Sequence, residues 1–256
     1  MAIITITSDW NNDDFYLGAL KGSILSHNPD VQITDLSNQV PPFNLSIAAF
    51  RVKHSYHYFP AGSVHIIAVN SEMRENRPLV AVKASKHFFI ACDNGLFGLL
   101  LDGEPEEVVS LSDENTGSFP ELSAYSRAAA QIAKSGRLDG FEKFKGELQR
   151  QVPMLPAIDE SVINGSVVYI DSYRNAITNI SRELFEQIGK GRSFEILVQS
   201  NHYRIKHLNS RYNETSPGEM LALFNSIGLL EIAINNGNVA DLLNLGLNSS
   251  IRIKFK

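Results

Sequence analysis

Cysteine is almost absent from this chain, since Cys92 is the only one among 256 residues. A single cysteine excludes an internal disulfide and any metal cage built from several thiolates. The sequence also lacks a run of about 18 consecutive apolar residues, which a membrane span needs. Its start, MAIITITSDW, has neither the basic nor the long apolar region of a signal peptide. These absences lead us to expect a cytoplasmic protein.

Positive charge is scarce as well. The 23 Lys and Arg residues are outnumbered by 28 Asp and Glu, the formal net charge is −5, and basic residues do not cluster in runs. Proteins that bind nucleic acid neutralise many phosphates, so we expect no nucleic-acid partner here. The sequence also contains no G-x-S-x-G, P-loop, G-x-G-x-x-G or HExxH motif, which removes the common hydrolase, NTPase, dinucleotide and zinc-site readings.

The first 150 residues alternate strand and helix patterns. IITIT (3–7) reads as a strand, an acidic loop follows, and YLGALKGSIL has helical spacing; VHIIAVN (64–70) reads as a buried strand and residues 123–136 as an Ala-rich helix. This alternation predicts an α/β domain with a layered sheet over residues 1–150. Ligands in such domains bind beyond the carboxyl ends of strands, where Asp9 and Asn70 stand.

The composition changes after residue 150. QVPMLPAID (151–159) contains two prolines and no clear period, which predicts a linker. Beyond it, short apolar runs recur with Gly and Asn turns between them. This spacing predicts a smaller all-β domain, a sandwich or barrel, over residues 160–256.

Two segments carry polar side chains suited to a ligand. Asp9, at a strand end, suits ligand hydroxyls, whereas Asp13 has the alternative role of helix N-cap. In YIDSYRNAITNI (169–180), Asp171, Tyr173 and Asn175 combine an acid, a ring and an amide. A ring can stack on a flat heteroaromatic ligand and an amide can read its edge; a hydrogen-bonded hairpin turn is the alternative.

Several motifs then fall in one colinear order. ITITSDWNNDDFYLGALKG resembles a family opening of T-D-F-G, an acid, Y-V-G and K-G, and CDNGLFGLLL resembles D-N-G-L. YIDSYRNAITNI is similar to Y-I-D-x-F-G-N-x-x-T-N, and PGEMLALFNSIGLLEIAINNG to P-G-E…S-x-G-x-L-E-I-A-x-N. The chain thereby resembles the S-adenosylmethionine hydroxide adenosyltransferases, the adenosine-forming S-adenosylmethionine hydrolases, which are related to the fluorinase and chlorinase.

The resemblance implies a homotrimer whose substrate lies between the N-terminal domain of one subunit and the C-terminal domain of the next. It implies S-adenosylmethionine or adenosine as the small-molecule ligand, with no cofactor and no metal. The implied substrate-binding residues are Asp9 for the ribose hydroxyls, Asp14 for the methionine ammonium, Phe43 beside the ribose and adenine, Asp171 and Ser226 for the methionine, and Tyr173, Asn175 and the backbone of Asn235 and Asn236 for the adenine.

The chain departs from the family in its chemistry. The family's Asp and Arg, which with a His handle the attacking water, fall on Asn70 and Arg77, and the His falls on Pro120. Neither Asn nor Pro accepts a proton from water. We expect Glu121, beside the lost His, to be the first candidate for a relocated base and Glu72 the second; both are solvated acids in the alternative interpretation.

Three functions follow from this pattern. Hydrolysis of S-adenosylmethionine to adenosine and L-methionine, weakened or altered, comes first, with Arg77, Asn70 and Glu121 as the catalytic set. A catalytically silent trimer that binds S-adenosylmethionine or adenosine is the second. An adenosyl transferase that uses another nucleophile or another adenosyl substrate is the third. Halide transfer is disfavoured, because Glu121 would repel a bound halide.

Overall fold

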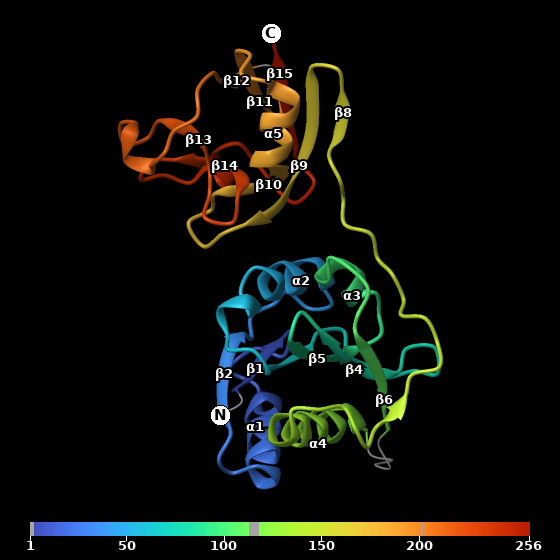
Figure 1. Ribbon diagram of the computed structural model, residues 1–256. Helices are drawn as coiled ribbons and strands as arrows, with labels where there is room; N and C mark the ends of the chain where they lie inside the picture. Colours follow the sequence, from blue (N-terminus) through green and yellow to red (C-terminus); the bar gives the residue numbers. More distant parts are fainter. Residues whose placement is uncertain (1–2, 113–117, 201) are drawn as a thin grey trace. The chain divides into compact units, whose positions relative to one another are not determined.

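The computed structural model describes residues 3–112, 118–200 and 202–256. The chain divides into two compact units, Met1–Pro153 and Met154–Lys256, which Figure 1 colours from blue to yellow-green and from yellow to red. No helix in the described part of the chain is long and apolar enough to cross a membrane.

The N-terminal unit alternates strands and helices as the sequence predicts. Its elements are β1 Ile3–Ser8, α1 Phe15–His27, β2 Gln32–Ser37, α2 Leu45–Lys53, the 3₁₀ turn η1 Tyr56–Tyr58, β3 Val64–Ala68, β4 Leu79–Ala84, β5 His87–Cys92, α3 Leu96–Leu100, β6 Glu107–Leu111, α4 Pro120–Ser135 and β7 Glu142–Lys143.

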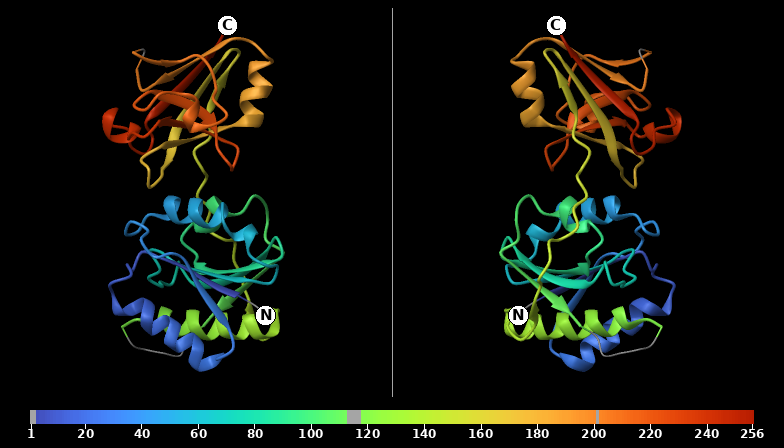
Figure 2. Two further views of the ribbon diagram at one scale, coloured as in Figure 1. Left: turned by 90° about the vertical axis from the view of Figure 1, so that its left-hand side faces the viewer. Right: turned by 90° about the vertical axis from the view of Figure 1, so that its right-hand side faces the viewer.

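These strands form one mixed sheet in the order β2-β1-β3-β5-β4-β6-β7. The first four are parallel, and β4, β6 and β7 join in antiparallel fashion. Figures 1 and 2 show α1 and α4 on one face of the sheet and α2 and α3 on the other. Because both faces are covered, β3 and β5 are buried along their whole length.

A buried histidine pair lies near the amino ends of these strands. A hydrogen bond of 2.7 Å joins Thr5 Oγ1 to His65 Nδ1, and one of 3.1 Å joins His65 Nε2 to His87 Nδ1. Burial, together with the neighbouring His87, lowers the pKa of His65 to about 3, and burial also lowers the pKa of His87. The pair is therefore neutral in the folded unit at ordinary pH.

The C-terminal unit is built from short strands. Its elements are β8 Ala157–Asp159, β9 Val162–Ile170, β10 Ala176–Ser181, α5 Arg182–Gly189, β11 Phe194–Val198, β12 Tyr203–Ile205, the 3₁₀ turn η2 Tyr212–Glu214, β13 Met220–Phe224, β14 Leu229–Ile234, α6 Val239–Leu242 and β15 Ser250–Phe255.

Every strand pair in this sheet is antiparallel, in the order β12-β11-β15-β9-β10-β14-β13, with β8 paired to β9. The end strands β12 and β13 lie beside each other, so the sheet nearly closes into a barrel around a core of aliphatic side chains. The predicted fold class, an α/β domain followed by a smaller barrel-like β domain, is confirmed.

Candidate functional site

The carboxylate of Asp9 joins three segments at the carboxyl ends of β1 and β3. Its Oδ2 accepts the backbone N–H of Phe43 at 2.9 Å and of Asn70 at 3.1 Å. Phe43 and Asn70 both have left-handed backbone, with φ of 64° and 48°. The carboxylate therefore fixes two loops in a conformation that non-glycine residues rarely adopt.

The side chains of residues 11–14 in the acidic loop and of Phe43 are exposed. Phe43 is 72% exposed, so only its backbone holds Asp9. Asp14, and not Asp13, occupies the N-cap position of α1, and its carboxylate makes no capping hydrogen bond. The predicted N-cap role of Asp13 is therefore wrong, because α1 begins one residue later, at Phe15. The exposed Asp14 carboxylate stands at a helix N-terminus with its oxygens open to solvent.

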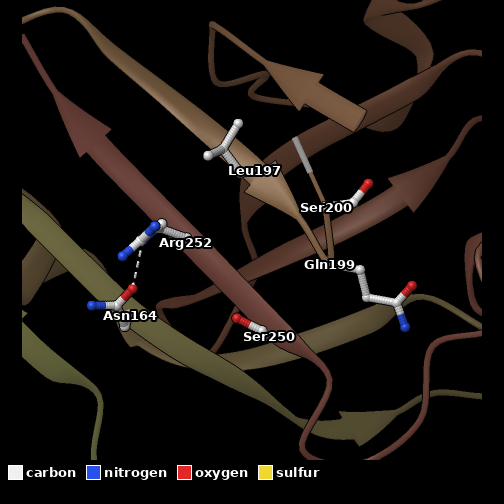
Figure 3. Close-up of a pocket in the computed structure, with 6 residues that line it drawn as sticks. All are labelled: Asn164, Leu197, Gln199, Ser200, Ser250 and Arg252. Carbon is white, nitrogen blue, oxygen red and sulfur yellow. Dashed lines mark hydrogen bonds between the residues drawn. The ribbon is translucent and has the colours of Figure 1, made fainter. Parts of the chain in front are cut away.

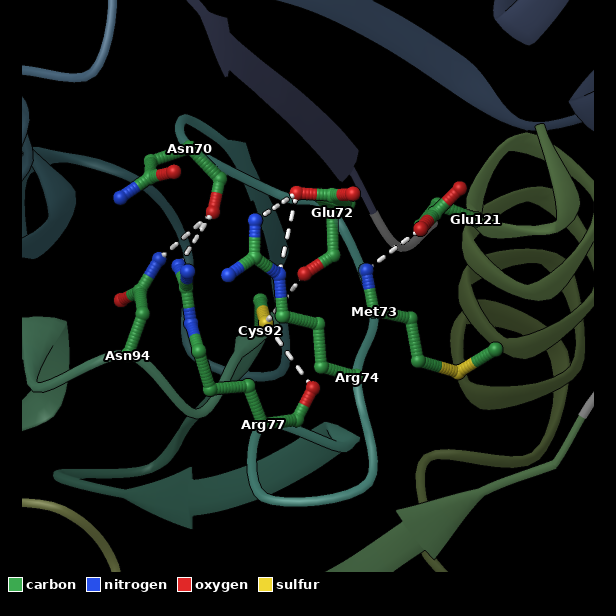
Figure 4. Close-up of polar contacts among 8 residues, drawn as sticks. All are labelled: Asn70, Glu72, Met73, Arg74, Arg77, Cys92, Asn94 and Glu121. Atoms are coloured by element: carbon green, nitrogen blue, oxygen red, sulfur yellow. Dashed lines mark hydrogen bonds and ion pairs between the residues drawn. The ribbon is translucent and has the colours of Figure 1, made fainter. Parts of the chain in front are cut away.

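The loop after β3 is held by side chains that donate hydrogen bonds to its carbonyl oxygens. Arg77 Nη2 donates to the Asn70 carbonyl at 2.9 Å, and Asn94 Nδ2 donates to the same carbonyl at 3.1 Å (Figure 4). Asn94 Nδ2 also donates to the Val69 carbonyl at 3.1 Å. Backbone hydrogen bonds between Arg74 and Arg77 close the loop on itself. The structure thus brings Asn70 and Arg77 together through the Asn70 backbone. Sequence reasoning gave Asn94 no role, although it belongs to the D-N-G-L signature.

Glu121 and Glu72, the two candidate bases, lie in opposite environments. Glu121, in the first turn of α4, is 4% exposed, and its Oε1 accepts the Met73 N–H at 2.5 Å. Glu72 has a side chain that is 67% exposed and pairs with Arg74. Figure 4 shows Glu121 reaching from α4 to the loop. Pro120 is the first residue of that helix, where its missing N–H costs no hydrogen bond.

Two buried groups lie beneath this loop. Cys92 donates its S–H to the Arg77 carbonyl at 3.2 Å, and burial raises the pKa of this thiol to about 11. Tyr125 in α4 is completely buried, and burial raises its pKa well above the ordinary value, helped by Cys92 and Glu121. The Ser71 hydroxyl opposes this rise. Within the described residues, however, the Tyr125 hydroxyl has no partner in hydrogen-bonding geometry, and neither has Arg77 Nε.

In the C-terminal unit, Asp171 and Asn175 close the loop between β9 and β10. Asp171 Oδ1 accepts the Asn175 N–H at 2.8 Å, Oδ2 accepts Asn175 Nδ2 at 3.1 Å, and the Asp171 N–H donates to the Asn175 carbonyl at 3.1 Å. Tyr173, at the tip, is 78% exposed. The hairpin-turn interpretation is therefore correct as geometry, and it leaves one aromatic ring available for stacking.

The remaining predicted residues flank β14. Ser226 lies in the turn before this strand, while Asn235 and Asn236 follow it directly. Asn235 Nδ2 donates to the Thr215 carbonyl at 2.6 Å, and the Asn235 carbonyl accepts the Gly218 N–H at 2.7 Å. Both backbone and side chain of Asn235 thus hold the segment before β13.

One hollow in the N-terminal unit, of about 660 Å³, is lined by Asn12 of the acidic loop and by residues of α1, β2 and α2. Another, of about 320 Å³, lies away from the predicted site residues on β9, β11 and β15 and is lined by Asn164, Leu197, Gln199, Ser200, Ser250 and Arg252 (Figure 3). It contains no carboxylate and no aromatic ring. No group of three or more His, Cys, Asp or Glu side chains within residues 3–112, 118–200 and 202–256 is arranged to hold a metal ion.

The fold and these loops define a class: a two-unit protein, α/β followed by a β-barrel, with pinned carboxylates and amides at strand ends in both units. The sequence model of the S-adenosylmethionine hydroxide adenosyltransferase N-terminal domain matches residues 4–142, and that of the C-terminal domain matches residues 165–252. The chain belongs to the S-adenosylmethionine hydroxide adenosyltransferase family, as the motifs predicted.

Relatives of known name cover nearly the whole chain. An "(R)-S-adenosyl-L-methionine hydrolase" of Methanocaldococcus jannaschii is 27% identical over 99% of this chain and 96% of its own length. A "Fluorinase" of Actinopolyspora mzabensis is 24% identical over 98% and 96%. The crystal structure of an uncharacterised conserved protein from Thermotoga maritima has the same fold, with a TM-score of 0.88 at 22% identity over 98% of this chain and 99% of that one.

Proposed function

We propose that this protein transfers the adenosyl group of S-adenosylmethionine to water, releasing adenosine and L-methionine. One observation carries the proposal. At a single edge of the N-terminal sheet, the pinned Asp9 carboxylate, the Asn70 and Arg77 loop and the buried Glu121 carboxylate are connected by hydrogen bonds through that loop. Family membership and the hydrolase name of the Methanocaldococcus relative support it.

The reaction needs water, a base and no cofactor. The water oxygen forms a bond to the ribose C5′ while the C5′–S bond breaks. The electron pair of the broken C5′–S bond goes to the sulfonium sulfur, so methionine leaves as a neutral thioether. The water proton passes to a carboxylate, for which Glu121 is the candidate. One Glu121 oxygen is held by the Met73 N–H, which leaves the second oxygen for the proton. Arg77 acts by holding the Asn70 loop in place.

The binding roles belong to the same proposal. Asp9 takes the ribose hydroxyls and Asp14 the methionine ammonium, while Asp171 and Ser226 hold the rest of the methionine. Phe43 and Tyr173 are exposed rings that suit the ribose and adenine faces. Asn175 and the backbone near Asn235 and Asn236 take the adenine edge.

The direct test is turnover followed by chromatography. We expect adenosine and methionine to appear in equal amounts from S-adenosylmethionine, with ¹⁸O from labelled water in the 5′-hydroxyl. The two epimers at sulfur are assayed separately, because the name of the Methanocaldococcus relative specifies the R form. Release of neither product from either epimer contradicts the proposal.

Assembly and location complete the proposal. A homotrimer would let the loops of the N-terminal unit of one subunit meet those of the C-terminal unit of the next, a heterologous contact that closes into a ring. Light scattering measures this directly, and a monomeric mass with ligand bound contradicts it. A cytoplasmic location, expected from the sequence, is tested by cell fractionation.

One observation favours a second candidate, a silent binder of S-adenosylmethionine or adenosine. Asn70 and Pro120 stand where the family has its proton-handling side chains, and neither can accept a proton. This candidate predicts at least micromolar binding, about −8 kcal/mol, with no product. Calorimetry together with the turnover assay separates the two functions.

A further inference from the structure

Glu231 is a buried carboxylate in the middle of β14 that has no role assigned above. It is 2% exposed. Tyr212 Oη donates to its Oε1 at 2.7 Å, and Asn225 Nδ2 donates to its Oε2 at 3.1 Å. Burial raises the pKa of Glu231, the Tyr212 and Asn225 hydrogen bonds lower it, and the Asn175 amide is near enough to lower it as well. A buried carboxylate is costly in a core that an apolar residue could fill.

The partners of Glu231 come from three separate segments. Tyr212 belongs to η2, Asn175 to the loop after β9, and Asn225 to the turn that contains Ser226. Asn225 also shapes that turn, because its Oδ1 accepts the N–H groups of Ile227 at 3.2 Å and Leu229 at 3.1 Å. One carboxylate therefore connects segments that carry proposed ligand residues.

The chemistry of these neighbours fixes which way the Asn175 amide faces. Its Nδ2 donates to Asp171 Oδ2 at 3.1 Å. Glu231 pairs with Ile177 in the antiparallel ladder of β10 and β14, so its side chain lies on the same face as that of Asn175, two residues along, and is the second carboxylate near the amide. Ionised carboxylates only accept hydrogen bonds, so both favour the NH₂ end of the amide. The Oδ1 atom then faces away from both acids as an acceptor. An acceptor matches the amino group of a 6-aminopurine and repels the carbonyl of a 6-oxopurine.

We propose that Glu231 is a positioning residue: together with Asp171 it holds the Asn175 amide with Oδ1 toward the ligand, and thereby makes the site select 6-aminopurine over 6-oxopurine nucleosides. The inference rests on the proposed function, because it takes the ligand of this unit to be a purine nucleoside.

The test is the ratio of two dissociation constants, for adenosine and inosine, measured by calorimetry on the full chain. Glu231→Gln keeps the shape but removes the charge and one acceptor, so that the NH₂ groups of Asn175 and Asn225 compete for the single side-chain oxygen that remains. We expect the preference for adenosine to fall about tenfold or more. Tyr212→Phe is the matched control: it removes one donor and leaves both carboxylates beside Asn175, so the ratio should stay within about twofold.

A second measurement uses the wild-type chain alone and does not depend on how a variant folds. An outward acceptor predicts that affinity falls from adenosine to purine riboside, which has no 6-substituent, and again to inosine. A wild-type chain that binds all three equally, or a folded Glu231→Gln variant with an unchanged ratio, overturns the role of Glu231 and leaves the proposed function standing. A wild-type chain that binds neither nucleosides nor S-adenosylmethionine overturns the proposed function and this inference with it.

Discussion

Asp9 in the N-terminal unit and Asp171 in the C-terminal unit are both half-buried carboxylates at strand ends, yet they are held differently. Asp9 takes backbone N–H groups from residues 34 and 61 positions away. Asp171 takes both its donors from a residue four positions away. The first carboxylate connects loops that are distant in sequence. The second closes one local turn, which lies near the buried Glu231. The motif resemblance predicts that the residues for chemistry depart from the family around Asp9, while those for binding keep its motif around Asp171.

The largest effect is expected in the N-terminal unit, where the proposed chemistry takes place. Glu121→Gln removes the candidate base and should lower the hydrolysis rate by about 10²–10⁴-fold, while calorimetry finds ligand affinity nearly unchanged. Glu72→Gln is the matched control, because that exposed carboxylate pairs with Arg74; its rate should stay near wild type. Vigorous hydrolysis by both variants would place the base elsewhere.

Asp9→Asn tests the carboxylate itself. We expect binding of adenosine to weaken by about 1.5–3 kcal/mol, the scale of a charged hydrogen bond, which is roughly a 10- to 150-fold rise in Kd. One oxygen of Asp9 accepts both N–H groups, and the amide oxygen of Asn can do the same. The fold should therefore survive, which circular dichroism checks. An unchanged Kd would show that the ribose is bound by other groups.

Acid should lower the free energy of unfolding more in the N-terminal unit than in the C-terminal unit. The pKa of His65 is about 3 in the folded unit and about 6.5 in an unfolded chain, so the unfolded state binds the proton first. The stability that this neutral histidine confers is complete above about pH 6.5 and is lost as the pH falls toward 3; by pH 5 the loss is about 2 kcal/mol.

The single tryptophan makes this measurable. Trp10 packs against the core of the N-terminal unit, so denaturant titrations followed by its fluorescence report that unit alone. The midpoint should fall between pH 7 and pH 5, and His65→Gln should flatten that dependence. Far-ultraviolet circular dichroism should show a smaller shift for the C-terminal unit, whose His202 and His207 are exposed. Equal shifts in both units would contradict the assignment.

The smallest effects come from a pair of Tyr→Phe changes. Tyr125→Phe removes a buried hydroxyl that lacks a partner and should raise the free energy of unfolding of the N-terminal unit by about 1 kcal/mol. Tyr212→Phe removes a hydroxyl bonded to Glu231 and should lower that of the C-terminal unit by about the same amount. Chemical denaturation of both variants gives the signs, and a common sign would show that one hydroxyl is misjudged.

Much of the fold could be predicted from the sequence because its signals are local. Fully buried runs such as VHIIA announce strands covered on both faces, and the Asp171 turn lies within a few residues of chain. The Asp9 contacts could not be predicted, because they depend on left-handed backbone at Phe43 and Asn70. The contrast between Glu121 and Glu72 also needed the structure, since α4 begins at Pro120, three residues before the helical pattern in the sequence.

The hydrogen bond between Met73 and Glu121 also limits which mutational paths are open to this protein. Within the described residues Asn70 contributes only backbone atoms to hydrogen bonds, so a change to Asp, which tolerates left-handed backbone as Asn does, carries little structural penalty. Glu121 cannot vary so freely, because its loss also unties the loop from α4. A lineage moving toward faster chemistry would therefore change position 70 first and position 121 last.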